Sequence, residues 1–428
     1  MSCPVNKTRR NRIPPAGKSG GAGATALCLL AVARATEAQS VLTPPPPFSI
    51  TPPAVLQLQT EKAGAIPSEE TGFGIPLGAS LLQWGPVNLR PHLLYRVLYA
   101  AGIPAAGTND VNTVIQSISP GMLFTLGSHW SLDYTPTLTF YSNKQFRDTL
   151  DHSVILTGGT AYEDWVFGLL QSYVSSSAPL VQTGTQTDTE IYATALTASY
   201  RFNSKLSMDL ALNQTIENAP LFTSYREWST SDYLNYQFWP RFDAGIGAGF
   251  GYVAVEAGSD MTYEQYQGRI DWRLADKLSL QLHGGVEDRQ FLSGNTGDLI
   301  NPVFGLAVLY QPVATTTLSV SADRAVSASY FENVVTESTG VTANLNQRLL
   351  KKLFLTLSGG YSNVKYVATG VSGLAGRNDN YYLFTARLTR SIGQHASVAV
   401  TYQYNDNASN QPFGFTSNQA GLELGYTF

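Results

Sequence analysis

The side chains that could serve as nucleophiles, bases or metal ligands are dispersed along the chain. Both cysteines, Cys3 and Cys28, lie near the N-terminus. None of the histidines belongs to a recognisable metal-ligand or Ser/His nucleophile motif. The five histidines are His92, His129, His152, His283 and His395. The sequence therefore predicts no enzyme, no cofactor and no metal site.

A glycine-rich segment has the wrong context for phosphate binding. Gly245, Gly247, Gly249 and Gly251 alternate with larger residues, and no helix follows them. Glycine inside a strand more often marks close approach, bending or a small inner face. The sequence therefore leaves these three roles open and excludes only a phosphate loop.

Charged residues recur at every second position and are better candidates for function. Between 260 and 274, Gly268, Ile270 and Trp272 share one face of the expected strand, and Arg269, Asp271 and Arg273 occupy the other. The candidates for lining a lumen are Arg201, Asp209, Glu227, Arg269, Asp271, Arg273, His283, Glu287, Arg289, Arg348, Arg387 and Glu423. Two hypotheses follow: paired charges that brace the wall, or a transverse field that orients solutes.

Strict alternation predicts the strands that hold these charges. Leu353, Leu355 and Leu357 alternate with Thr356 and Ser358, as expected for a strand with one apolar face. Trp165, Trp239 and Trp272 fall near expected turns, where aromatic rings suit a membrane boundary, and Tyr361 and Tyr366 would belong to the opposite girdle. A soluble sandwich would show the same alternation.

The turns distinguish a soluble β-sandwich from a membrane barrel. Short turns are expected near Ser128, Asp164, Ser204, Pro240, Asp276, Pro312, Lys351 and Gly393, at spacings of 36 to 42 residues. A longer loop is expected between successive turns, as at 142–150, 175–187, 291–299, 368–379 and 405–414. We predict an all-β, transmembrane, antiparallel up-and-down β-barrel of about 18 strands, with 16 as the alternative. Its short turns would be periplasmic and its longer loops extracellular.

The composition agrees with a membrane barrel. Charged residues are 14% and aromatic residues 11% of the 428 residues, while the mean hydropathy is −0.07. After residue 40 no run approaches the 18 or so apolar residues of a spanning helix. A closed barrel hides its apolar surface in every second residue.

The N-terminus resembles an export signal. Basic residues precede a small, apolar run from Gly21 to Val32, and cleavage is expected just before Gln39. Removing six Lys/Arg and one acidic residue leaves 21 basic and 30 acidic residues, a net charge of −9, which disfavours nucleic acid. We predict a signal peptide at 1–38, a Pro-rich periplasmic segment at 39–90 and the transmembrane barrel at 91–428.

The C-terminus predicts the route of assembly. Leu422, Leu424, Tyr426 and Phe428 alternate with polar or small residues up to the last residue. This resembles the signal that the barrel assembly machinery of the outer membrane reads. The expected location is therefore the cell outer membrane, reached after Sec export and signal removal.

Two stretches resemble a bacterial family known as β-barrel porin 2. The first runs from Asp260–Gln267 through Gly284–Phe291, and the second is Asn88–His92 with Tyr95 and Tyr99. The resemblance covers about residues 80 to 428 and implies an outer-membrane barrel. Some related barrels are associated with exopolysaccharide export.

Three functions remain open from the sequence. The first is a porin that passes small polar solutes, because the inward face carries charges of both signs. The second is a polysaccharide-export barrel that acts with periplasmic export components. The third is a closed structural or surface-interaction barrel, favoured if the long loops pack into the lumen. The other expected partners are outer-membrane lipid and the barrel assembly machinery.

Overall fold

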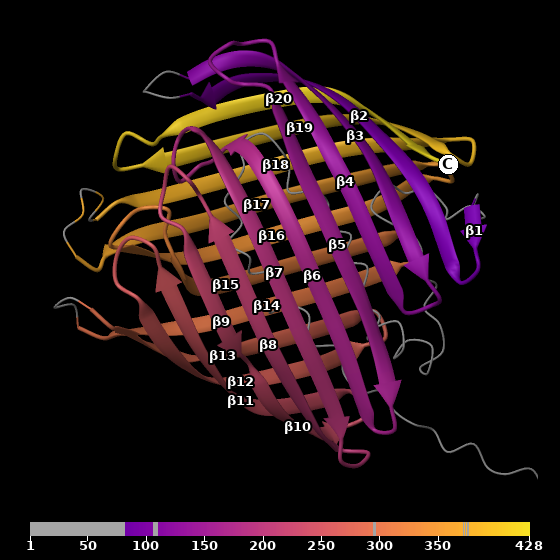
Figure 1. The fold of residues 1–428 in the computed structure, drawn as a ribbon. Helices are drawn as coiled ribbons and strands as arrows, with labels where there is room; N and C mark the ends of the chain where they lie inside the picture. The colour runs from indigo at the N-terminus through magenta and orange to yellow at the C-terminus, as the bar shows by residue number, and fades with distance from the viewer. Residues whose placement is uncertain (1–81, 106–109, 294–296, 371, 373, 375) are drawn as a thin grey trace, which may run out of the picture.

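The chain forms one closed antiparallel sheet (Figure 1). The computed structural model describes residues 82–428 except 106–109, 294–296, 371, 373 and 375. The signal peptide and most of the Pro-rich segment lie outside these residues. The ring closes where β2 pairs with β20, from His92 opposite Thr427 to Ala101 opposite Asn418.

The strands follow one another around the ring in chain order. They are β1 (Leu82–Trp84), β2 (Val87–Pro104), β3 (Asp110–Leu126), β4 (Trp130–Tyr141), β5 (Thr149–Tyr162), β6 (Trp165–Pro179), β7 (Gln186–Arg201), β8 (Leu206–Asn218), β9 (Tyr225–Thr230), β10 (Asp232–Trp239), β11 (Phe242–Val255), β12 (Met261–Ala275), β13 (Leu278–Phe291), β14 (Leu299–Val313), β15 (Thr316–Ala328), β16 (Val334–Leu350), β17 (Leu353–Ala368), β18 (Asn378–Ile392), β19 (Ala396–Ser409) and β20 (Phe415–Thr427).

The barrel wall has 18 strands, as predicted. β9 and β10 both pair with β8 and β11 and act as one wall strand. Ser231 between them keeps two backbone hydrogen bonds to Ala211, of 3.0 and 3.1 Å, so the ladder continues through the interruption. β1 pairs only with β2 and stands outside this count.

Short turns occupy one end of the barrel and longer loops the other. Seven of the eight predicted turns fall on the residues that connect two strands, and Pro312 lies on β14 one residue before that strand ends. The chain end and β1 lie at the short-turn end (Figure 1). None of the described residues forms a helix with the length and apolar character needed to cross a membrane.

Alternation separates an apolar outer face from a polar inner face. On β20, Leu422 and Leu424 are 57% and 50% exposed, while Glu423 between them is 3% exposed. Tyr361 and Tyr382 likewise lie outward, opposite each other on β17 and β18. The placement of Tyr366 in an outer girdle is wrong. It lies five residues after Tyr361, so alternation turns it inward, where it is buried.

One seam of the wall stays unpaired toward the long-loop end, unlike the β3–β4 seam, which skips residues 119–121 and resumes at Met122 opposite Tyr134. β13 and β14 pair from Leu278 opposite Tyr310 to Arg289 opposite Leu299, the first residue of β14. β14 and β15 pair only as far as Phe304 opposite Arg324. Residues 299–303 of β14 and 325–328 of β15 therefore do not pair with each other at the long-loop end.

Candidate functional site: the inner wall of the barrel

A basic cluster lies on the inner wall where the barrel closes. Arg96 on β2 approaches Glu423 on β20, with 2.9 Å between Nε and Oε1. Arg387 on β18 approaches the other carboxylate oxygen at 2.7 Å. Two guanidinium groups thus share one buried carboxylate, and this part of the wall has excess positive charge.

An acidic cluster surrounds Arg269 on β12. Its guanidinium pairs with Asp209 on β8 and donates a 2.6 Å hydrogen bond to Asn235 on β10. Asp271 lies 4.0 Å from its Nε and is directly opposite Asp243 on β11. Three carboxylates and two guanidinium groups, those of Arg269 and Arg273, lie here, so the excess charge has the opposite sign.

The two clusters lie on opposite sides of the ring. β18, β20 and β2 stand across the lumen from β8, β10, β11 and β12 in the strand order (Figure 1). Arg387 and Arg269 both lie nearer to the short turns than to the long loops. Opposed charges of this kind produce a field across an aqueous lumen, which acts on polar and charged solutes.

A row of hydrogen bonds continues from the acidic cluster toward the long loops. Tyr233 donates to Gln267 (2.9 Å), Gln267 to Gln265 (2.7 Å), and Gln265 to Glu287 (2.6 Å). The other oxygen of Glu287 accepts a 2.8 Å bond from Arg289. These residues present amides, hydroxyls and charges along one side of the inner wall.

The alternating glycines of β11 face inward, beneath two tyrosine rings. A Cβ atom at Gly247 would lie 2.5 Å from the Tyr233 ring, and one at Gly251 would overlap the Tyr263 ring. Arg269 and Arg289 stack over these rings, at 4.3 and 4.7 Å from the centroids. The glycines thus let the tyrosine rings lie flat against the wall, in agreement with a small inner face rather than a phosphate loop.

Pairing and alternation place all twelve sequence-predicted residues on the inner face. Arg201, Arg273 and Arg348 are exposed at the short-turn end. Glu227 accepts a 2.5 Å bond from Tyr263. His283 is half-buried, and a Cβ atom at Gly305 would overlap its ring. Their role in lining a pore stays a prediction.

Several inner-wall residues were missed in the sequence. Arg96, Tyr233, Asn235, Gln265 and Gln267 complete the two clusters and the hydrogen-bonded row. The missing signal was available, because each occupies the inward position of an alternating strand. The four neutral residues gave no reason to choose them, whereas Arg96 carried the same charge signal as its neighbours and was still missed.

The long loops pack against one another across the outer end of the lumen. The β8–β9 loop donates a 2.9 Å hydrogen bond from Thr223 N to Tyr330 O in the β15–β16 loop. The Phe331 ring contacts those of Phe222 and Phe413, from the β8–β9 and β19–β20 loops. Burial, reinforced by the Glu217 carboxylate, raises the pKa of the Tyr330 hydroxyl well above its ordinary value. Tyr330 therefore remains neutral in this mouth.

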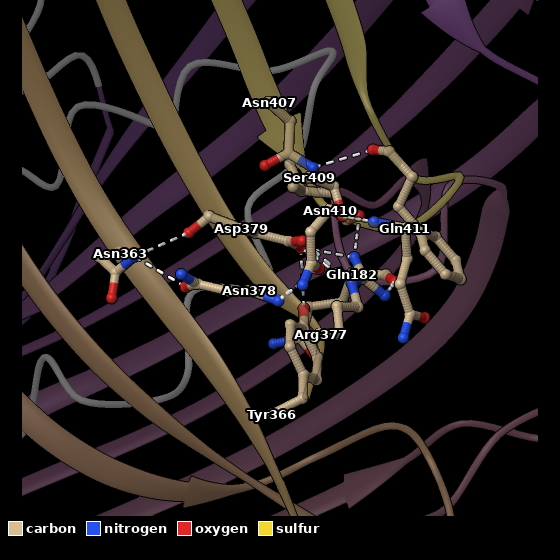
Figure 2. Close-up of polar contacts among 12 residues, drawn as sticks. Gln182, Asn363, Tyr366, Arg377, Asn378, Asp379, Asn407, Ser409, Asn410 and Gln411 are labelled. Atoms are coloured by element: carbon tan, nitrogen blue, oxygen red, sulfur yellow. Dashed lines mark hydrogen bonds and ion pairs between the residues drawn. The ribbon is translucent and has the colours of Figure 1, made fainter. Parts of the chain in front are cut away.

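Arg377 joins loops from opposite sides of the mouth. Its guanidinium bonds Asp379 at 2.6 Å and donates to Gln182 O, in the β6–β7 loop, at 2.8 Å. The Tyr366 and Phe413 rings lie 4.3 and 3.6 Å from it. Figure 2 shows Arg377 among Gln182, Tyr366 and Asp379. The long loops thus narrow the outer mouth, while the inner wall remains polar.

The fold and this wall define a closed, 18-stranded β-barrel with a polar interior. No family model matches the chain, and no curated protein matches it. Solved structures of similar fold include the following three Pseudomonas aeruginosa proteins. They are OprD (12% identity, TM-score 0.40, covering 79% of this chain and 95% of that chain), OccK2 in complex with glucuronate (11%, 0.43, 79% and 98%) and the siderophore receptor PirA (11%, 0.39, 79% and 80%).

Proposed function

We propose that the chain is an outer-membrane porin through which small polar solutes cross. The observation that carries this proposal is the inner wall, on which a basic and an acidic cluster oppose each other inside an apolar shell. A shell of exposed Leu, Val and aromatic residues suits lipid, and charge on that face would be costly. The charges of the inner face are instead paired with one another, as Glu423 is with Arg96 and Arg387.

The location and family belong to the same proposal. The C-terminal alternation ends at Phe428, whose backbone N donates to Pro91 O at 3.0 Å beside the seam that closes the barrel. An outward apolar row that ends the last strand supports recognition by the barrel assembly machinery. Membership of the β-barrel porin 2 family rests on the sequence resemblance alone.

Planar-bilayer conductance tests the porin proposal. Purified protein should open discrete pores, and Glu423→Gln should raise the anion-to-cation permeability ratio about twofold, the effect of one charge roughly 10 Å away in water. Glu264→Gln is the matched control, because Glu264 lies on the outer face opposite Phe250. Protein that opens no pore, even without residues 39–81, would rule out the proposal.

A closed structural barrel is the second candidate, favoured by the packed mouth. Loops 219–224, 329–333 and 410–414 meet there through aromatic contacts. The same conductance measurement separates the two functions. A polysaccharide-export barrel differs in requiring periplasmic components, so adjacent export or glycosyltransferase genes would favour it.

A further inference from the structure

The incomplete seam between β14 and β15 ends at a proline. Continuing the register from Phe304 opposite Arg324 would place Pro302 opposite Val326. Pro302 O accepts a 3.2 Å bond from Arg324 Nε, so its backbone polar groups point toward β15. Because proline has no N–H, it cannot supply the donor that the next pair requires. The ladder therefore stops where that donor is missing.

Two arginines satisfy the carbonyl groups left by the break. Arg324 bonds Pro302 O, and Arg289 reaches from β13 to donate a 3.1 Å bond to Val326 O. Arg289 is 2% exposed and also pairs with Glu287, which is 1% exposed. The break thus has specific side-chain partners in place of the missing backbone pairing.

Beyond the break, the ends of β15 and β16 fold into the lumen. Val326, Ala328 and Val335 continue the alternation that turns Leu318 and Val341 outward. Yet these three are buried in one cluster with Tyr225, Val253, Met261 and Tyr263 from β9, β11 and β12. The outward-turned face of this hairpin therefore rests on the inward-turned faces of β9, β11 and β12.

Charges on the same face agree with this infolded position. Arg324 and Glu337 lie on the same face of β15 and β16, which points outward nearer the short turns. They form a 2.9 Å ion pair. Glu337 accepts a 3.2 Å bond from Asn301, an inward residue of β14. Infolding thus gives Glu337 polar partners inside the barrel.

We propose that residues 325–337 are a flap that closes the outer half of the lumen, and that solutes pass when it swings away from β9–β13 to rejoin β14. The proposal rests on the porin function. The flap is held by one apolar cluster, the two arginine-capped carbonyls and the Asn301 bond, while its tip carries Tyr330 and Phe331 into the mouth. Opening would exchange these contacts for backbone pairing along one seam.

A cross-link tests whether the flap must move. Phe222 and Phe331, whose ring centroids are 5.8 Å apart, are replaced together by cysteine and bridged with a short, reducible bifunctional thiol reagent. Bridging holds the flap in its closed state and should lower conductance at least about tenfold, because the open state is no longer populated. Reducing the bridge should restore the conductance. The control pair Tyr361→Cys and Tyr382→Cys, at 5.1 Å across an intact seam, should leave conductance unchanged.

A second variant tests the cause of the break. Pro302→Val restores the missing donor. It should raise the ratio of flaps paired with β14 to flaps folded into the lumen roughly fivefold, the effect of about one hydrogen bond. The shift would appear as longer pore openings. It would also appear as faster maleimide labelling of V335C, because Val335 is 1% exposed while the flap is folded in and becomes accessible only when the flap opens. Pro312→Val, on the same strand away from the break, is the control.

The outcomes separate the flap from the pore. A bridged protein that conducts like the unbridged one, or Pro302→Val with unchanged labelling, would overturn the flap and leave the porin function standing. Absence of pores in every variant, even without residues 39–81, would overturn both proposals. Reversible loss on bridging together with faster labelling in Pro302→Val would establish the flap.

Discussion

The seams on the two sides of the β13–β14 hairpin have the same alternating pattern but end differently. β12 and β13 remain paired from Ala275 opposite Leu278 to Met261 opposite Phe291. β14 and β15 separate above Phe304, where the next donor would come from Pro302. The difference shows that hydrophobic alternation selects the faces of a strand, whereas a missing donor near the end of a strand can stop its pairing. Pro120 and Pro136 lie in the middle of the β3–β4 seam and only interrupt its ladder, which resumes at Met122 opposite Tyr134.

The largest expected effect comes from removing the arginine that caps the broken seam. Arg289→Ala leaves Glu287 buried without its ion-pair partner and Val326 O without its donor, and should lower the free energy of unfolding by about 3–5 kcal/mol. Urea unfolding in lipid vesicles measures this. Arg241→Ala, which breaks an exposed pair with Asp276, should cost no more than about 1 kcal/mol. Equal losses would mean that Arg289 does not stabilise the break.

A smaller loss of stability should follow from disturbing the intact β12–β13 seam. A Cβ atom at Gly285 would overlap the carbonyl oxygen of Tyr266 on β12, whereas one at Gly284 has its closest neighbour at 3.5 Å. Gly285→Ala should cost about 1–3 kcal/mol because the strands must shift apart. Gly284→Ala should be nearly neutral in the same unfolding assay. If both variants unfold alike, close backbone approach is not what Gly285 provides.

The smallest expected effect is at the contact between the flap and β14. Asn301→Ala removes the 3.2 Å bond to Glu337 and should cost about 0.5–1.5 kcal/mol, the usual range for one hydrogen bond. Asn346→Ala, at an exposed bond to Thr356 on the intact β16–β17 seam, should change stability by about 0.5 kcal/mol or less. The ranking of these two variants distinguishes a specific flap contact from a generic polar one.

Much of the fold could be predicted because its determinants are local. Leu353, Leu355 and Leu357 define the faces of β17 within a few residues, and turn residues define where each hairpin reverses. Turn spacing then gave the strand number, which the structure confirms. The β9–β10 interruption at Ser231 escaped prediction, because hydrogen bonds to Ala211 preserve the pattern on both sides.

The inner wall was less predictable because its contacts join distant strands. Asp209 and Arg269 could each be placed inward, but no local pattern pairs them or adds Asn235. The flap was not anticipated either. Its signals were Pro302 inside a strand and two charges, Arg324 and Glu337, on a face that alternation turns toward lipid. Taken singly, neither the proline nor the two charges indicates a flap. Their connection becomes visible only in the tertiary structure.

Closure of the ring by β2 and β20 has a consequence for biogenesis. His92 pairs with Thr427 and Arg96 shares a row with Glu423, so the seam joins the two ends of the barrel sequence. Contacts this distant along the chain form late and slowly, because loop-closure entropy must be overcome first. Until they form, β2 and β20 are both unpaired edges, which invite pairing with other chains. Partly assembled barrels should therefore be the species most prone to aggregate, and shielding this one pair of edges should be the chief requirement placed on any assembly factor.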